Sequence, residues 1–364
     1  MRKKLPDLIL LFTILALVLS GLIMILSASS VKADRLFDNS YHFFLRQIQY
    51  LFVALIFSVI IYKLKYESIK KLAPYLLIFS FITLILVLIP GLGRVAGGSR
   101  RWLPLGPINF QPSELAKLII VIYLAAYIDK NRDKMKNFSN GILPPVIVIG
   151  FIFLLILAEP DLGTAVTLVA VAGSMIFVGG IKIPLFIFSS ISALALFLGA
   201  IYIEPYRRER LLTFLNPWKD PLDSGYHIIQ SLLALGSGGL FGVGPGNSHQ
   251  KFLYLPEPGT DFIFAVLGEE FGLIGTLFVL ILYFLLAWRG LKIASRVDDV
   301  FASMLAVGIT SMIIIQAVIN MSVVTSLMPV TGITLPLISY GGSSLVVNLI
   351  ALSLLLNISR YAED

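Results

Sequence analysis

The sequence predicts an all-α polytopic membrane protein with about ten transmembrane helices. Hydrophobic residues make up 57% of the 364 residues and charged residues only 13%, about half the charged share of a soluble domain. The apolar residues fall in continuous runs of about 17 to 25, the length that a helix needs to cross the hydrocarbon core. These runs do not alternate polar with apolar residues, which excludes a membrane β-barrel.

Polar boundaries divide the chain into ten apolar spans. The first run is longer than a signal-peptide core, so we expect it to remain as a helix. The Lys and Arg residues cluster in short loops that alternate along the chain, which predicts cytoplasmic termini. The predicted spans are residues 8–28, 46–62, 72–90, 113–128, 142–158, 163–180, 184–203, 262–288, 302–325 and 341–358.

A long extracytoplasmic loop, residues 204–261, is the largest interruption between the spans. Its segments 206–212 and 225–235 are amphipathic and precede a glycine-rich stretch, 236–246. We expect two short interfacial helices and a glycine-bent loop. The chain 1–364 is therefore interpreted as a single membrane domain with this loop as its principal outer feature, and a lid without chemistry of its own is the alternative.

The composition also limits the chemistry. The chain has no cysteine and three histidines, which argues against a thiol nucleophile, a disulfide framework or a His/Cys metal site. Acid–base chemistry therefore falls to carboxylates. The net charge of +7 is explained by membrane orientation, and no nucleic-acid partner is expected.

Asp261 is the principal candidate, because it stands where the long loop becomes a transmembrane helix. A carboxylate there is suited to act as a general base at the membrane surface, and a helix N-cap is the alternative. Glu269 and Glu270 follow about 12 Å along the same predicted helix. Glu114 and Lys117 lie one turn apart in another span, where a structural ion pair and a polar cavity are both open.

Further candidates lie in the other outer loops. Arg94, Arg100 and Arg101 oppose the usual charge bias on a short loop, which favours an anionic ligand over ordinary lipid head groups. Glu159 and Asp161 stand at an outer helix turn. The last outer loop, residues 328–344, contains Ser339 and Ser343 and is expected to line the same cavity.

Several motifs in order along the chain resemble the SEDS family (shape, elongation, division and sporulation) of membrane glycosyltransferases. They cover nearly the whole sequence, and segments 246–258, 331–336 and 357–360 resemble the division branch, FtsW, more than the elongation branch, RodA. Gly259 departs from the pattern, since many relatives have His there. The motifs are Leu26-Ser-Ala-Ser-Ser30, Arg100-Arg-Trp-Leu103, Gln111-Pro-Ser-Glu-Leu-Ala-Lys117, Glu159-Pro-Asp-Leu-Gly-Thr164, Gly236-Ser-Gly-Gly-Leu-Phe-Gly242, Thr260-Asp-Phe-Ile-Phe264 and Ile338-Ser-Tyr-Gly-Gly-Ser-Ser344.

The resemblance implies an inverting peptidoglycan glycosyltransferase that polymerises lipid II into β-1,4 glycan strands at the outer face of the bacterial cytoplasmic membrane during cell division. It implies that Asp261 is the catalytic base and that Glu114 and Lys117 shape the cavity and supply charge. It also implies lipid II, the nascent glycan strand, a class B penicillin-binding protein (FtsI-like) and other division proteins as partners. The candidates for binding the diphosphate are Arg94, Arg100, Arg101, Arg207, Arg208 and Arg210.

Three expectations stay open at this point. A divalent cation, Mg²⁺ or Mn²⁺, is an additional candidate for the diphosphate, and no organic cofactor is expected. A lipid II flippase or another transporter, a scaffold that recruits division proteins, and a RodA-type polymerase are the alternative functions. Lys117 or an outer-loop arginine is expected to keep Asp261 ionised.

Overall fold

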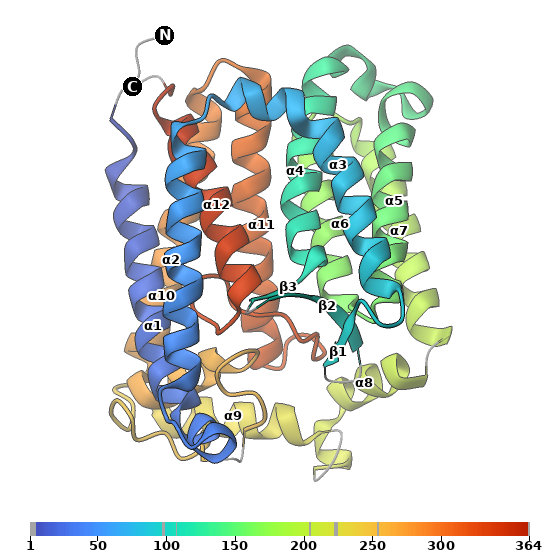
Figure 1. The fold of residues 1–364 in the computed structure, drawn as a ribbon. Helices are drawn as coiled ribbons and strands as arrows, with labels where there is room; N and C mark the ends of the chain where they lie inside the picture. The colour runs from blue at the N-terminus through green and yellow to red at the C-terminus, as the bar shows by residue number, and fades with distance from the viewer. Residues whose placement is uncertain are drawn as a thin grey trace.

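The computed structural model describes residues 5–96, 99–106, 108–203, 205–221, 225–252 and 255–362. Ten helices correspond one to one with the ten predicted spans and run side by side as a bundle (Figure 1), which confirms the polytopic helical fold. They are α1 (Leu8–Phe37), α2 (His42–Lys63), α3 (Tyr66–Leu88), α4 (Pro112–Lys130), α5 (Leu143–Ala158), α6 (Leu162–Val178), α7 (Ile183–Ile203), α10 (Ile263–Arg296), α11 (Val300–Val324) and α12 (Gly342–Ser359).

Seven helical segments of the described chain are long and apolar enough to cross a membrane by themselves. The other three spans belong to α4, α6 and α7. Helix α4 carries Glu114 and Lys117 within the bundle, and α6 is a shorter apolar helix, Leu162–Val178. Helix α7 is 21 residues long, and several of its side chains lie outside the described residues. A 17-residue helix such as α6 is about 25 Å long, and it packs against α11, α4 and α5 in the bundle.

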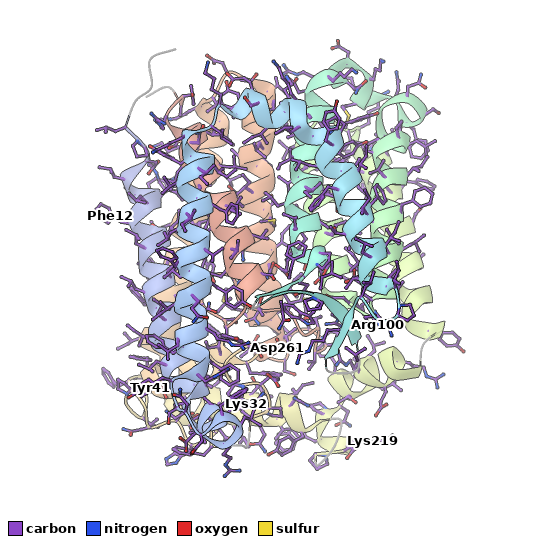
Figure 2. The ribbon with its side chains drawn as sticks, in the orientation of Figure 1. Phe12, Lys32, Tyr41, Arg100, Lys219 and Asp261 are labelled. Atoms are coloured by element: carbon purple, nitrogen blue, oxygen red, sulfur yellow. The ribbon has the colours of Figure 1, made fainter. Side chains whose placement is uncertain are left out.

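The centre of the bundle is formed by α4, α11 and α12. Helix α11 packs against α10, α4 and α6, and α12 packs against α2. Large apolar side chains on the outside are exposed, as expected for contact with lipid, and Phe12 is one of them (Figure 2). Polar side chains such as Gln316 and Asn320 on α11 are instead buried inside, where their amide nitrogens donate to backbone carbonyls.

One end of the bundle carries all the larger connections and is called the loop end. The two predicted loop helices are confirmed as α8 (Pro205–Leu215) and α9 (Tyr226–Gly238), with a short 3₁₀ turn, η3 (Pro217–Lys219), between them. The start of α1 and the end of α12 lie together at the opposite end (Figure 1), where η1 (Arg132–Lys136) and η2 (Phe138–Ile142) join α4 to α5.

A small antiparallel sheet at the loop end was not foreseen in the sequence. Strands β1 (Arg94–Ala96), β2 (Ser99–Leu105) and β3 (Ile108–Phe110) pair in the order β1-β2-β3, with Arg94 opposite Trp102 and Leu103 opposite Phe110. The sheet leads directly into α4. It therefore gives the basic segment around Arg100 a fixed backbone in place of the expected loop.

Helix α10 is broken at Gly272, whereas the sequence predicts one continuous helix. Gly272 has φ +64° and ψ −160°, and a Cβ there would lie 2.4 Å from the backbone nitrogen of Gly242, so only glycine fits. The glycine-rich segment satisfies the freed backbone groups: Val243 N–H donates to the Glu269 carbonyl at 2.9 Å, and Leu273 N–H donates to the Gly239 carbonyl at 2.9 Å.

Candidate active site

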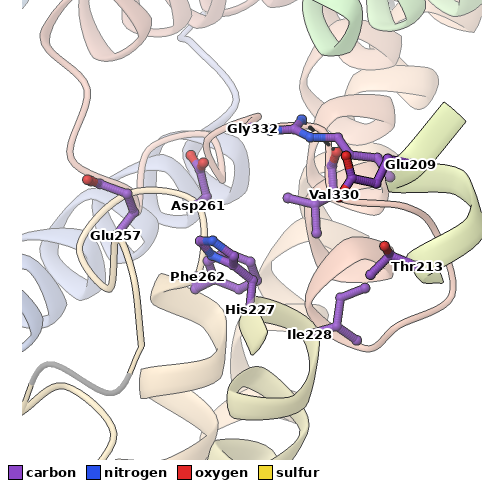
Figure 3. A pocket seen from close by; sticks show the side chains of 10 residues that line it. Glu209, Thr213, His227, Ile228, Glu257, Asp261, Phe262, Val330 and Gly332 are labelled. Atoms are coloured by element: carbon purple, nitrogen blue, oxygen red, sulfur yellow. Dashed lines mark hydrogen bonds between the residues drawn. The ribbon is translucent and has the colours of Figure 1, made fainter. Parts of the chain in front are cut away.

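Asp261 lies at the loop end, immediately before α10. The predicted alternative of an N-cap is wrong, because the N-cap position is Phe262 and no side chain caps this helix. Within the described chain the Asp261 carboxylate accepts no hydrogen bond, and it faces a cleft of ≈ 350 Å³ (Figure 3). The cleft is lined by Glu209, Arg210, Thr213, His227, Ile228, Glu257, Asp261, Phe262, Val330 and Gly332.

The backbone around Asp261 is held by helix α11 and by the last loop. Asn320 on α11 donates its side-chain amide to the carbonyls of Asp261 (2.8 Å) and Ile333 (2.7 Å). The Ser339 hydroxyl donates to the Thr260 carbonyl at 2.6 Å, and Tyr340 N–H donates to the Gly259 carbonyl at 2.8 Å. The last loop thus braces the segment that carries Asp261, and the predicted site residue Ser339 acts through the backbone.

The surroundings of Asp261 raise the pKa of its carboxyl from 3.8 to about 6. Burial is the largest cause, and Glu257 adds to it, whereas Arg101 and Arg210 lower the pKa. A carboxylate with this pKa is ionised at neutral pH and is also a stronger base than an ordinary aspartate, which suits general base catalysis.

Arg101 links the sheet to the turn between α5 and α6. Its guanidinium donates to the carbonyls of Glu159, at 3.3 Å, and Pro160, and lies 3.8 Å from Asp161 Oδ2. Asp161 in turn caps α6 by accepting the Thr164 N–H at 3.1 Å. Glu159 is fully buried, and burial together with Asp161 raises its pKa to about 8, so that it is protonated at neutral pH.

The predicted pair Glu114 and Lys117 is buried in α4. Lys117 Nζ donates to Glu114 Oε1 at 2.9 Å and to Gln316 Oε1 at 2.6 Å, and Gln316 Nε2 donates to the Thr334 carbonyl at 3.0 Å. Through Gln316, the pair is therefore connected to the backbone of the last loop at Thr334. Among the described side chains, the cations that act on the pKa of Asp261 are Arg101 and Arg210, and Lys117 is not one of them.

The remaining predicted residues are distributed over the loop end. Arg210 lines the cleft and donates to the Val330 carbonyl at 3.0 Å, while Arg208 and Arg94 are exposed outside it. Arg100 donates to the Leu88 carbonyl at 3.1 Å. Ser343 joins α12 to the start of α4, since its hydroxyl donates to the Asn109 carbonyl and accepts the Gln111 N–H, both at 3.0 Å. The side chain of Arg207 lies outside the described residues.

Glu269 and Glu270 anchor the loop to α10. Glu269 accepts from the Ser248 hydroxyl at 2.5 Å and from His249 N–H at 2.9 Å. Glu270 accepts from Lys251 Nζ at 2.8 Å and from the Ser27 hydroxyl at 2.5 Å. Both carboxylates precede the break at Gly272 and bind residues of the long loop.

Sequence reasoning did not select His227, Glu257, Glu209 or Thr213, which all line the cleft. The available signals were the amphipathic pattern of segment 225–235, which contains His227, and the proximity of Glu257 to Asp261 in the chain. Neither signal says which residues face Asp261. As for metals, the described residues contain no group of three or more His, Cys, Asp or Glu side chains that could hold an ion.

The fold and the site together define a polytopic membrane protein with an acid–base group and arginines at one end of its helix bundle. The chain belongs to the FtsW/RodA/SpoVE family, whose model, described as "Cell cycle protein", matches residues 7–364. This match confirms the family that the sequence motifs predicted.

Relatives of known name extend over the full length of the chain. Stage V sporulation protein E of Bacillus subtilis (strain 168) is 47% identical over 100% of this chain and 99% of its own length. A probable peptidoglycan glycosyltransferase FtsW of Geobacter sulfurreducens (strain DL-1 / KN400) is 42% identical over 97% of this chain and 95% of its own length.

Solved structures of the family share the fold. One chain comes from a peptidoglycan synthase complex that coordinates polymerization and crosslinking; it matches with a TM-score of 0.81, 32% identity and coverage of 99% of both chains. The crystal structure of the rod shape determining protein RodA of Thermus thermophilus matches with a TM-score of 0.71 and 30% identity, over 99% of this chain and 98% of that one.

Proposed function

We propose that this chain is an inverting peptidoglycan glycosyltransferase that polymerises lipid II into β-1,4 glycan strands, with the loop end on the outer face of the cytoplasmic membrane. Relatives named as probable peptidoglycan glycosyltransferases support the reaction class. The observation that carries the proposal is Asp261, whose carboxylate binds none of the described residues and has a pKa of about 6 in a cleft that also contains Arg210.

The proposed reaction assigns a role to each of these groups. Asp261 removes the proton from the 4-hydroxyl of the acceptor GlcNAc, and the hydroxyl oxygen attacks the anomeric carbon of the lipid-linked donor. The bond from that carbon to the diphosphate oxygen breaks, and the electron pair leaves with the diphosphate. A single in-line displacement changes the α-linked donor into a β-1,4 product. Arg210 stabilises the departing negative charge, and Arg101 adds positive potential from the sheet.

A divalent cation bound to the diphosphate of the substrate, Mg²⁺ or Mn²⁺, is part of the proposal. The described residues do not form a three-ligand site for it, so no step is assigned to the metal. In this proposal its contribution is additional positive charge on the leaving group.

The transporter alternative is less well supported. A flippase needs polar groups along the full depth of the membrane, and Glu269 and Glu270, which stand within a predicted span, are candidates for such groups. Both bind loop residues, namely Ser248 and Lys251, before the break in α10. A scaffold would have no need for an acidic group in an open cleft.

The proposed partners follow from the reaction and from the relatives. Glycan strands need crosslinking, and one structural relative belongs to a complex that coordinates polymerization and crosslinking. We therefore propose a class B penicillin-binding protein as the partner and the division site as the place of action, with the elongation and sporulation roles of relatives as alternatives.

The test is glycan synthesis in a reconstituted complex. The protein and its cognate penicillin-binding protein receive labelled lipid II with Mg²⁺ or Mn²⁺, and glycan ladders are compared for wild type, Asp261→Asn and Asp38→Asn at equal folded amounts. Asp38 is an exposed loop-end residue at the end of α1. We expect ladders from wild type and Asp38→Asn only. Ladders from Asp261→Asn would refute the assigned base, and no ladders from any of these proteins in a verified complex would refute the polymerase.

A further inference from the structure

His227 occupies the wall of the cleft next to the proposed base. It is the second residue of α9, and its ring stacks on the ring of Phe262, with a centroid distance of 5.9 Å and an interplanar angle of 25°. Phe262 directly follows Asp261 in the chain. Figure 3 shows the His227 ring beside Phe262 with its nitrogen-bearing edge toward Asp261. The stacking therefore fixes the imidazole relative to the carboxylate.

The helix that carries His227 is held firmly. The Ser231 hydroxyl on α9 donates to the Val324 carbonyl of α11 at 2.7 Å. Gly238 at the end of α9 touches α10 so closely that a Cβ would lie 2.0 Å from the Gly268 carbonyl oxygen. With α9 fixed on α11 and on the first half of α10, His227 cannot move away from the cleft without disturbing these contacts.

One ring nitrogen of His227 lacks a partner. Nδ1 is closed to solvent and makes no hydrogen bond to the described residues. A buried polar atom without a partner is costly, so such atoms in native proteins usually have a specific role. Because Nδ1 is closed in this arrangement, the ring contacts the cleft through its remaining atoms, and because no described residue binds Nδ1, either ring nitrogen is able to carry the proton.

The charge state of His227 limits what that ligand group is. Burial is the main cause that lowers its pKa, Arg210 lowers it further, and Glu257 opposes them. The ring is therefore neutral at neutral pH, with one nitrogen that donates and one that accepts a hydrogen bond. Such a ring suits a hydroxyl or an amide group, whereas the guanidinium of Arg210 suits the anionic part of the same ligand.

We propose that His227 is a substrate-positioning residue whose neutral imidazole hydrogen-bonds a hydroxyl or acetamido group of a sugar and holds that sugar against Asp261. This inference rests on the proposed glycosyltransferase function. It divides the cleft into a side for neutral sugar groups at His227 and a side for negative charge at Arg210. Asp261, which removes the proton, lines the same cleft.

Two substitutions separate this role from simple packing on Phe262. His227→Phe retains an aromatic ring for the stacking but removes both nitrogens. His227→Gln loses the ring but retains a donor and an acceptor. Packing alone predicts that the Phe variant is the better of the two, and hydrogen bonding to a sugar predicts that the Gln variant is. His249→Phe is the matched control, because His249 is exposed in the same loop and does not line the cleft.

The experiment measures binding and turnover separately. Binding of labelled lipid II is measured in the Asp261→Asn background, so that it does not depend on catalysis, and KM and kcat are measured with Asp261 intact. We expect His227→Phe to weaken binding and raise KM by about tenfold, the effect of one lost hydrogen bond to a ligand, and His227→Gln and His249→Phe to stay within about threefold of wild type by the same scale.

The outcomes distinguish this inference from the proposed function. Equal losses in the Phe and Gln variants, or unchanged binding in the Phe variant, would overturn the role of His227. Lipid II binding with the expected His227 pattern, but without glycan synthesis by the wild-type complex, would uphold the binding role and refute the polymerase.

Discussion

The Asn320 side chain binds the backbone of Asp261. Its amide nitrogen donates to the Asp261 carbonyl at 2.8 Å and to the Ile333 carbonyl at 2.7 Å. One residue in the centre of the bundle thus joins two loop segments that are far apart in the chain. This contact positions the Asp261 carboxylate in the cleft without using the carboxylate itself, which remains available for a substrate.

Asn320→Leu is expected to separate positioning from stability. Asn357 is a matched control, because its amide makes the same kind of double contact at the opposite end of the bundle, to the carbonyls of Tyr62 (2.5 Å) and Leu64 (2.9 Å). Each Leu variant leaves two buried carbonyls with fewer partners and should lose about 1 to 3 kcal/mol of stability. Only Asn320→Leu should also lower kcat, by about 10- to 100-fold, as expected for a displaced catalytic group.

Thermal unfolding and glycan synthesis of the two variants, compared at equal folded amounts, check this prediction. If kcat fell equally in both variants, the activity would follow general stability. The hydrogen bonds from Asn320 would then have no special effect on Asp261.

The activity should rise with pH through about 6, because Asp261 accepts a proton only when it is ionised and its pKa lies at about 6. The stability should change in the opposite sense. Between pH 3.8 and about 6 the folded protein retains a proton on Asp261 that the unfolded chain has lost, so the free energy of unfolding falls as pH rises through this window. Asp261→Asn should remove this part of the pH dependence.

The measurement is a pH–rate profile of kcat with a parallel profile of the unfolding temperature. Glu159→Gln is the control, since Glu159 has a pKa of about 8 and is already protonated near pH 6. The acidic limb is the part of the pH–rate profile in which kcat falls as the pH falls. If Glu159→Gln shifted this limb, the limb would be assigned to Glu159, which would contradict the role of Asp261.

Arg210→Gln should move the acidic limb to higher pH, because Arg210 lowers the pKa of Asp261. Arg208→Gln, on the same helix but outside the cleft, should leave the limb in place. Lys117→Met should lower the activity by loosening the last loop but should not move the limb, since Lys117 binds Glu114 and Gln316. The pH–rate profiles of these three variants decide whether an arginine or the lysine keeps Asp261 ionised.

Glu270→Gln should destabilise the protein strongly. Glu270 and Lys251 form an ion pair at 2.8 Å, and both side chains are at most 4% exposed. The substitution leaves the lysine charge buried without its counterion, for which the expected loss is about 3 to 5 kcal/mol. The double variant Glu270→Gln, Lys251→Met should recover part of this loss.

Thermal unfolding in the same detergent or lipid for the single and double variants provides the measurement. A double variant less stable than Glu270→Gln alone would show that the Lys251 contacts to Ser27 (3.0 Å) and the Gly246 carbonyl (2.6 Å) outweigh the ion pair.

The ten helices, the two loop helices and the place of Asp261 between loop and helix follow from the sequence alone. These features depend on continuous local patterns, since an apolar run of sufficient length must form its backbone hydrogen bonds internally in a membrane. The motifs in order also determined the family, because each motif is a short contiguous segment.

The working arrangement of the site was decided by tertiary structure. The partner of Lys117, Gln316, lies 199 residues away, and His227 reaches the cleft only because α9 packs on α11 and on the first half of α10. The break at Gly272 likewise depends on the approach of Gly242. Such contacts depend on how distant segments meet in space, so no local pattern of residues contains them.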